Sequence, residues 1–355
     1  MQQWRRGHAI RLVLLPNANG KRLIRDVIDR HGRVLIAAGN VLWPELVSLL
    51  AKHKIAAVWV KDDETEKVNN HEIWAVDDLV DEQTRLTLMD GLQQTLVGNK
   101  KLTEQLEVMK VGVLQIVEEL SRRQDLLLYL NDIRGVSNYL YKHSVNVSIL
   151  AIALGLTIGL TKDEVYLLGM GGLLHDLGKM RIDPAILDKR GPLTVDEFKQ
   201  VKEHTIIGYN MLRLETQLDP RIALIALQHH EYSNCMGYPW GIVKNDIHPF
   251  SRIIAICDVF DALTTDRAYR SRMPARAAMK IITAGSDQQF DGELVEAFRK
   301  VAVIYNIGCR VKLSNGLYGE VAGLNSADAS RPIVATKFGL INLFYKPELD
   351  IVEAI

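Results

Sequence analysis

The feature that most constrains this chain is a charged pair placed directly after an apolar helical run. His175 and Asp176 follow the sequence GMGGLL at 169–174. Such a run is typical of a buried helix, and a carboxylate at a buried helix end needs a partner because its desolvation is costly. A metal ion is a natural partner. The pair therefore indicates a helical core with polar chemistry inside it.

Length and composition indicate a folded chain with two or three units. The chain has 355 residues, of which 48% are hydrophobic and 24% are charged, so a sizeable core can form. Lysine plus arginine and aspartate plus glutamate number 43 each. Because nucleic-acid-binding proteins usually carry a basic excess, this balance argues against a nucleic-acid polymer as partner. It leaves room for a local basic pocket that takes a small phosphate ligand.

The cysteines and the apolar segments favour a cytoplasmic protein that does not enter a membrane. The three cysteines are Cys235, Cys257 and Cys309. They form no CxxC pair, and an odd, sparse set suits a reducing compartment better than a disulfide framework. The apolar run at 9–15 is too short for a signal peptide. The longest apolar stretch, at 149–160, is too short to cross a bilayer and is typical of a buried helix.

The pattern of expected elements divides the chain into four parts. Residues 1–76 are expected to form a small mixed α/β domain, because short apolar strands alternate there with turns and a short helix. A helical connector at 77–130 leads into a strongly helical part at 131–305. Residues 306–355 are expected to form a small β appendage, since alternating apolar residues flank an Asn-Gly turn. The fold class is therefore mainly α.

Two helix starts in the central part carry clear capping signals. Thr161 and Glu164 fit a capping box, in which the threonine oxygen and the glutamate carboxylate accept hydrogen bonds from free backbone N–H groups. Thr194 and Glu197 fit a second box. Each box predicts a helix that begins directly after its threonine.

Histidines and aspartates lie on or beside apolar helices throughout the central part. The candidate metal ligands are His143, His175, Asp176, His204, His229, His230 and Asp258. Imidazole and carboxylate groups together suit iron, manganese, zinc or nickel. Taken singly, each residue is more often an ordinary hydrogen-bonded side chain or a helix cap than a ligand. The joint pattern changes the interpretation, because all of these helices can direct their polar residues into one core.

Three basic residues near these candidates suit a phosphate ligand. Lys179 lies one helical turn beyond His175 on the same face, where it can bind a phosphate oxygen or assist a leaving group. An exposed lysine at a helix end is its ordinary alternative. Arg267 and Arg270 are three residues apart and can clamp a phosphate. A solvated helix face would explain these two arginines equally well.

A series of motifs in one order resembles the HD-GYP subset of the HD phosphohydrolases. The series consists of His175-Asp176 with Lys179, His204, His229-His230-Glu231, Gly237-Tyr238-Pro239 and the run DVFDALTTDRAYR that begins at Asp258. The similarity covers roughly 135–305 and implies an HD-type helical bundle. The first part of the chain is similar to a small domain that often precedes such units. The tail resembles a β extension that often follows them.

The resemblance implies a metal-dependent phosphodiesterase that hydrolyses cyclic di-GMP to pGpG and, in a second cleavage, to GMP. It assigns one metal to His143, His175, Asp176 and Asp258, and a second metal to Asp176, His204, His229 and His230. Asp176 would thus bridge two divalent ions, either iron or manganese. The implied catalytic residues are Lys179 and Asp176, and the implied nucleotide contacts are Tyr238, Arg267 and Arg270.

Several positions depart from the family pattern without removing a ligand. Asn234 and Cys235 stand where aspartate and glycine are typical before the GYP triplet, Arg181 where a small residue is usual, and Ala268 where proline is common. These changes bear on loop geometry and turnover rate rather than on metal binding. Tyr139 occupies the place of a glutamate that members with a third metal carry, so we expect two metals and not three.

Two alternative functions are consistent with the sequence. The chain can be an inactive nucleotide-binding regulator that works through protein partners; the altered loop at 234–235 leaves room for this, whereas the intact ligand set and Lys179 argue against it. It can also be an HD enzyme for another nucleotide, such as cyclic GMP-AMP or a mononucleotide. The GYP triplet favours a cyclic dinucleotide. A homodimer or a signalling partner is compatible with each function.

Overall fold

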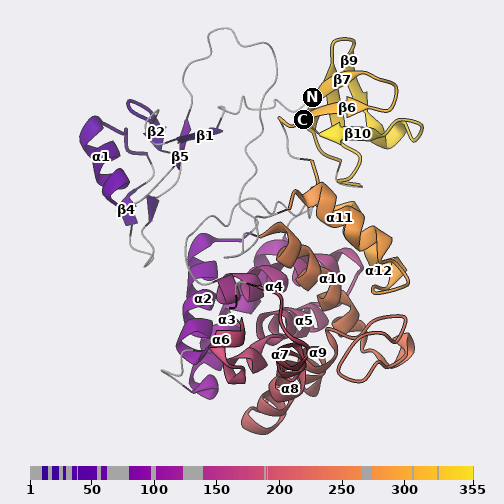
Figure 1. Ribbon diagram of the computed structural model, residues 1–355. Coiled ribbons are helices and arrows are strands. Elements are labelled where there is room, and N and C mark those ends of the chain that lie inside the picture. The colour runs from indigo at the N-terminus through magenta and orange to yellow at the C-terminus, as the bar shows by residue number, and fades with distance from the viewer. Residues whose placement is uncertain are drawn as a thin grey trace. The chain divides into compact units, whose positions relative to one another are not determined.

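The chain forms two compact units, whose helices and strands are labelled in Figure 1. The computed structural model describes residues 10–14, 18–23, 27–28, 34–37, 39–53, 57–61, 80–96, 101–122, 139–187, 189, 191–265, 273–305, 308–325 and 328–354. One unit comprises 78–305 and 326–330, and the other comprises 1–77, 306–325 and 331–355. The four-part division expected from the sequence stays a prediction.

The larger unit is helical, which confirms the mainly α fold class. Its α-helices are α2 (Glu82–Leu96), α3 (Leu102–Ser121), α4 (Tyr139–Thr157), α5 (Lys162–Leu174), α6 (Pro184–Leu187), α7 (Val195–Lys202), α8 (His204–Glu215), α9 (Pro220–Gln228), α10 (Pro249–Thr264), α11 (Ala275–Ala284) and α12 (Gly292–Val301). Two short 3-10 helices, η2 (Leu177–Arg181) and η3 (Lys244–Asp246), lie between them. Helix α5 contacts α3, α4, α9 and α10, so it lies at the centre of the unit.

One hydrophobic core runs through the helical unit. Buried Leu88 of α2 and Ile116 of α3 belong to the same core as Ile152 of α4 and Leu168 of α5. Burying this apolar surface is the main stabilising contribution to such a core. Helices from the segment 77–130 therefore help to build the unit that holds the candidate site.

Two glycines allow the elements that carry the site to approach closely. A Cβ atom at Gly172 would lie 3.0 Å from the Cα of Ser148, so α5 and α4 are nearly in backbone contact there. A Cβ atom at Gly178 would overlap the backbone carbonyl of His204. Only glycine fits such close approaches. As a result, α5 packs closely against α4, and η2 packs closely against the start of α8.

The two predicted capping boxes are confirmed. In α5, the Thr161 side chain accepts from the Glu164 N–H, and the Glu164 carboxylate accepts from the Thr161 N–H at 2.9 Å. Thr194 and Glu197 make the same pair of hydrogen bonds at the start of α7. These interactions satisfy N–H groups that the first helical turn leaves free.

The first part of the smaller unit is mixed α/β, as expected. Strands β1 (Ile10–Leu14), β5 (Ala57–Lys61) and β2 (Arg22–Leu23) form an antiparallel sheet in the order β1-β5-β2, and β3 (Val27–Ile28) pairs with β4 (Val34–Ile36). Helix α1 (Pro44–Lys52) begins with a proline, which suits the first helical position because its missing N–H would be unpaired there anyway.

The C-terminal part of the smaller unit is a β-sheet, which confirms the expected appendage. Strands β6 (Arg310–Leu313), β7 (Tyr318–Gly323), β8 (Ile333–Thr336), β9 (Gly339–Asn342) and β10 (Ile351–Ala354) form an antiparallel sheet in the order β10-β6-β7-β8-β9. A 3-10 helix, η4 (Leu343–Tyr345), follows β9. The predicted hairpin joins β6 to β7, and its Gly316 has a φ of +84° that glycine adopts readily.

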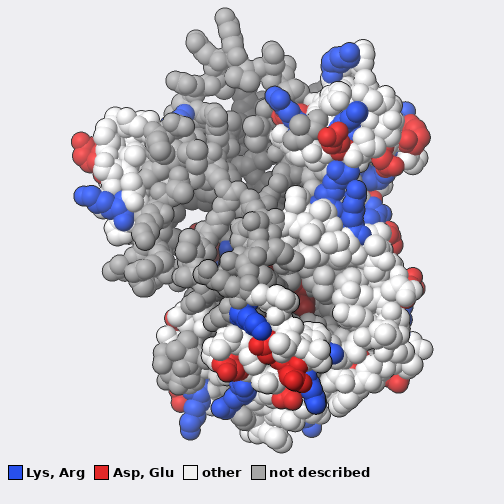
Figure 2. All heavy atoms as spheres, viewed as in Figure 1, with Lys and Arg blue, Asp and Glu red and all other residues white. Residues whose placement is uncertain are grey.

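The charges on the visible face of the helical unit are mixed, and the described helices are not of the kind that spans a membrane. No helix within the described ranges has the length and apolar character needed to cross a membrane. On the face drawn in Figure 2, lysine and arginine side chains of the helical unit are interspersed with aspartate and glutamate. This mixture agrees with the equal numbers of basic and acidic residues in the chain.

Candidate metal centre

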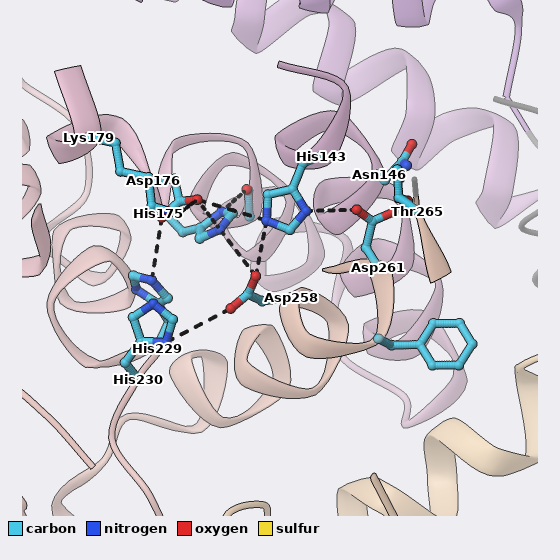
Figure 3. Close-up of polar contacts among 12 residues, drawn as sticks. His143, Asn146, His175, Asp176, Lys179, His229, His230, Asp258, Asp261 and Thr265 are labelled. Atoms are coloured by element: carbon cyan, nitrogen blue, oxygen red, sulfur yellow. Dashed lines mark hydrogen bonds and ion pairs between the residues drawn. The ribbon is translucent and has the colours of Figure 1, made fainter. Parts of the chain in front are cut away.

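Seven polar side chains meet inside the helical unit, and Figure 3 labels all of them except His204. They are His143 in α4, His175 after the end of α5, Asp176 before η2, His204 at the start of α8, His229 and His230 after α9, and Asp258 in α10. All except the half-buried His230 are buried. The structure thus brings together every residue that the sequence analysis named as a candidate metal ligand.

The donor atoms of these side chains fall into two groups. One group is His143, His175 and Asp258, and the other is Asp176, His204, His229 and His230; within each group the donor atoms lie within 4.8 Å of one another. Asp176 lies between the groups: its Oδ2 is 3.4 Å from Nε2 of His175, and its Oδ1 is 3.4 Å from Nε2 of His204. This carboxylate can therefore serve both groups at once.

Backbone carbonyls orient three of the histidine rings. The Nδ1 atoms of His175, His204 and His229 lie 2.7, 2.6 and 3.0 Å from the carbonyl oxygen three residues earlier. A carbonyl oxygen only accepts, so each Nδ1 must carry the proton and donate it. Each neutral ring then directs the lone pair of Nε2 into the cluster, which is the orientation that a metal-binding histidine needs.

Several atoms in the cluster can only accept hydrogen bonds and have no donor beside them, so the cluster suits a cation. The Nε2 atoms of His204 and His229 lie 3.4 Å apart, but with both protons on Nδ1 neither Nε2 can donate to the other. Two further buried atoms, Nε2 of His175 and Oδ1 of Asp176, have no hydrogen-bond partner among the described residues. Buried polar atoms are rarely left unpaired. A divalent cation within reach of these atoms would satisfy them together.

Burial keeps several of the imidazoles neutral. Desolvation lowers the pKa of His204 to about 4 and that of His230 to about 3, and it also lowers the pKa of His229. The nearby Asp176 opposes the shift in His204 and His229 without reversing it. At neutral pH these rings are therefore unprotonated, which is the state in which imidazole binds a metal.

His143 lies between two carboxylates. Its Nε2 is 3.0 Å from Asp258, and its Nδ1 is 2.7 Å from Asp261 on the following turn of α10 (Figure 3). Burial lowers the pKa of His143, but hydrogen bonds to Asp258 and Asp261 outweigh burial and raise it to about 9. Burial likewise raises the pKa of Asp258, but the hydrogen bond with His143 and nearby charges hold it below its usual range.

The role of Asp261 was not recognised from the sequence. Its Oδ2 faces Nδ1 of His143, while its Oδ1 accepts from Asn146 at 2.6 Å and from the Thr265 hydroxyl at 3.2 Å. The carboxylate is buried and fixes the ring of His143 from the side opposite the cluster. Its spacing of three residues from Asp258, on the same apolar helix, is the signal that would have identified it.

Lys179 contacts the centre directly. Its Nζ lies 2.5 Å from Oδ2 of Asp176, and its side chain is 23% exposed. Lys179 does not lie one α-helical turn beyond His175, as expected, because α5 ends at Leu174 and the chain tightens into the 3-10 helix η2. Lys179 reaches Asp176 from three residues away rather than lying above His175. It is consequently not the freely exposed helix-end lysine of the ordinary alternative.

The GYP triplet forms a loop that covers one side of the centre. The ring of Tyr238 lies with its centroid 4.7 Å from that of His230, and burial raises the pKa of its phenol. The buried Glu231 holds this loop: its Oε1 accepts from the N–H groups of Trp240 and Gly241, and its Oε2 accepts from Ile242. A carboxylate therefore fixes the backbone that follows Tyr238.

The remaining predicted positions are placed only in part. Arg267 and Arg270, the expected phosphate clamp, and Ala268 lie outside the described residues. The side chain of Tyr139 is likewise not described, although α4 begins at this residue. Cys235 has a φ of 64°, a conformation that favours glycine and agrees with the glycine typical of this position.

Arg181 and Asn234 are exposed and do not belong to the two groups of donor residues. Arg181 is exposed at the end of η2. The backbone N–H of Asn234 donates to the carbonyl of Gln288 at 2.9 Å, and its side-chain oxygen accepts from the Met236 N–H at 3.0 Å. Neither departure from the family pattern therefore changes the donor set of the centre.

Comparisons with known proteins agree with this architecture. Residues 131–294 match the model of the HD domain family. The chain is 36% identical over 227 residues to the cyclic di-GMP phosphodiesterase PA4108 of Pseudomonas aeruginosa, covering 63% of this chain and 55% of that protein. It is 40% identical over 141 residues to the cyclic di-GMP phosphodiesterase response regulator RpfG of Xanthomonas campestris, covering 39% of this chain and 37% of that protein.

A solved structure shares the fold. It is that of an HDG"Y"P protein from Bdellovibrio bacteriovorus, which aligns with a TM-score of 0.52 and 17% sequence identity over 81% of this chain and 98% of that one. The chain spans about half, or less, of the length of the two curated relatives. Residues 131–294, which match the model of the HD domain family, contain all seven clustered side chains and the GYP triplet.

Proposed function

We propose that this chain is a metal-dependent phosphodiesterase that hydrolyses cyclic di-GMP. The observation that carries the proposal is the placement of Asp176 between two groups of histidine and carboxylate donors, with the amine of Lys179 beside it. Curated relatives that are named as cyclic di-GMP phosphodiesterases support the choice of substrate. The chain spans about half of their length, so the substrate is carried over as part of the proposal.

The donor set suits two divalent ions, iron or manganese. His143, His175 and Asp258 would hold one ion, and His204, His229 and His230 would hold the other, with Asp176 shared between them. Nitrogen and carboxylate ligands without thiolate suit both metals. When bound, such ions would activate water as a nucleophile and stabilise negative charge on a phosphoryl oxygen.

Side chains of the protein would stabilise the transition state and bind the nucleotide. Lys179 would place its ammonium beside a phosphoryl oxygen and stabilise the charge that builds there as the P–O bond breaks. Tyr238 would cover the bound nucleotide, and Arg267 and Arg270 would hold the second phosphate. Cleavage of one diester releases a ribose 3′ oxygen and gives linear pGpG. A second cleavage of that product would give GMP.

Hydrolysis of cyclic di-GMP is the direct test of this proposal. Protein purified without oxygen and loaded with Fe²⁺ or Mn²⁺ should convert cyclic di-GMP to pGpG, measured by chromatography of the nucleotides. His175→Ala and Asp176→Ala should each reduce the rate to background, because each removes a donor near the shared position. His53→Ala is the matched control, since His53 is exposed and lies in the other unit, and its rate should equal that of the unchanged protein.

The result also separates the alternative functions. Binding of cyclic di-GMP without turnover in the metal-loaded protein would exclude the phosphodiesterase and favour a nucleotide-binding regulator. Faster hydrolysis of cyclic GMP-AMP or of a mononucleotide would instead retain the metal chemistry and replace the substrate.

A further inference from the structure

Helix α7 lies on the surface of the helical unit and contributes no buried residue to its core. It is held instead by the Thr194 capping box and by an ion pair in which Nζ of Lys189 lies 2.6 Å from Glu197. Even so, it carries an aromatic side chain, Phe198, that is 46% exposed. Core packing does not explain an aromatic residue on such a helix.

Phe198 and Lys202 lie one helical turn apart and share a face. The Phe198 ring meets the ring of Tyr238 edge to face, with centroids 6.3 Å apart. The Nζ of Lys202 lies 4.8 Å from the centroid of Phe198 and 5.1 Å from that of Tyr238. The two side chains and Tyr238 thus form one cluster of two rings and a cation, here called the α7 platform.

The α7 platform is continuous with the metal centre. The ring of Tyr238 contacts both Phe198 and His230, and its centroid lies 4.7 Å from that of His230. The centroid of His204 is also 6.4 Å from that of Tyr238. A ligand whose phosphate lies at the metal centre would therefore extend past Tyr238 onto α7.

The cation of this platform lies over the two rings. Lys202 makes no ion pair with any carboxylate in the described part of the chain, and it is half-buried. Ammonium groups only donate hydrogen bonds, whereas aromatic faces accept stacked bases of any kind. A donor next to an exposed ring suits a planar, aromatic ligand that presents acceptors along one edge.

We propose that Phe198 and Lys202 form a guanine-binding subsite for the substrate, an inference that rests on the proposed function. Guanine presents two adjacent acceptors, N7 and O6, whereas adenine presents N7 beside an N6 amino donor. Lys202 can donate to guanine at both positions but faces a donor in adenine. Phe198 supplies a stacking face for the base. The subsite makes the centre select guanine over adenine.

The test compares the binding of guanine and adenine ligands to the full metal-loaded chain. The probes are phosphorothioate analogues of cyclic di-GMP and cyclic di-AMP, which are hydrolysed slowly enough for a dissociation constant to be measured. Lys202→Met should weaken binding of the guanine analogue about tenfold, as expected for loss of a charge-assisted hydrogen bond, and leave the adenine analogue nearly unchanged. Phe198→Ala should weaken both analogues about tenfold, because stacking does not distinguish the bases.

Two further variants control for indirect effects. Lys202→Arg keeps donors that match N7 and O6, so it should retain the preference for guanine. Lys199→Met removes an exposed lysine from the same helix and should change neither dissociation constant. An equal loss for both analogues in Lys202→Met would mean that Lys202 merely supports Tyr238, and it would overturn the inference. Unchanged binding in both Phe198→Ala and Lys202→Met would overturn it as well.

The same measurements separate this inference from the proposed function. If the protein binds the guanine analogue with the expected dependence on Lys202 but does not hydrolyse cyclic di-GMP, the subsite stands and the phosphodiesterase proposal fails. If it hydrolyses cyclic di-GMP while Lys202→Met keeps its preference for guanine, the phosphodiesterase proposal stands and the subsite fails. Binding of neither analogue to the unchanged protein would contradict a guanine subsite outright.

Discussion

Asp261 positions His143 in the candidate metal centre. Its two oxygens accept from the His143 ring, from Asn146 and from the Thr265 hydroxyl, so the carboxylate is fully engaged. A carboxylate behind a ligand histidine fixes the ring orientation and raises its basicity. The position of His143 in the donor set therefore depends on a residue that would not itself touch a metal.

Asp261→Asn should weaken metal binding. The asparagine has a single acceptor oxygen, and its NH₂ group would face either the His143 N–H or the Asn146 NH₂, which are both donors. Loss of such an outer partner typically reduces metal affinity about 10- to 100-fold, which competitive titration with a chelator would measure. Asp163→Asn, which changes an exposed residue in the first turn of α5, should leave the affinity unaltered. Equal affinities for the two variants would show that Asp261 only stabilises the fold.

The joint pattern of histidines and aspartates predicted the candidate donor residues more completely than the groups that orient them. The seven candidates stand out because histidine and aspartate are unusual beside apolar helices. By contrast, the partners of the histidine Nδ1 atoms are mostly backbone carbonyls, which every residue carries and no sequence pattern marks. Asp261 lies within the motif DVFDALTTDRAYR, but its contact with His143 depends on how α10 packs against α4.

At the scale of elements, the loop after α9 depends on one buried carboxylate. Glu231 accepts three backbone N–H groups from residues 240–242. Hydrogen bonds to an ionised group are stronger than those between neutral groups. The same loop carries Tyr238, so Glu231 sets the position of the ring that covers His230.

Glu231→Gln should loosen this loop without emptying the metal centre. A glutamine keeps one acceptor oxygen and turns an NH₂ group toward backbone N–H donors, so at least one of the three hydrogen bonds is lost. We expect faster amide exchange at residues 240–242 and a KM for cyclic di-GMP raised about tenfold, consistent with a cost of about 1–3 kcal/mol for an unsatisfied buried donor. The metal content should not change. Amide exchange equal to that of the unchanged protein would refute this role.

Elements with local signals were predictable, and elements decided by distant contacts were not. Both capping boxes encode their helix starts within four residues, so the starts of α5 and α7 followed from the sequence. The switch from α5 to the 3-10 helix η2 did not. This switch occurs where η2 approaches α8 and Gly178 lies against the carbonyl of His204. The spacing of apolar residues along the chain does not reveal such a contact between distant segments.

At the scale of the whole molecule, the helical unit collects the site from distant parts of the chain. The seven side chains come from residues 143 to 258 and are brought together by one core to which α2 and α3 also contribute. The order of motifs predicted this grouping through its resemblance to a family. Single-residue reasoning left it open, because each histidine also has an ordinary explanation.

The number and position of bound metal ions test most directly whether the histidine and aspartate cluster is a two-metal site. We would purify the protein without oxygen, determine its metal content and locate the ions by anomalous diffraction. We expect two ions per chain, one near His143, His175 and Asp258 and one near His204, His229 and His230, with Asp176 between them. A third ion is not expected, since like charges crowded in a poorly solvated site repel strongly and position 139 offers a phenol instead of a carboxylate. Reproducible counts of one or three ions, or ions bound elsewhere with this cluster empty, would contradict the account.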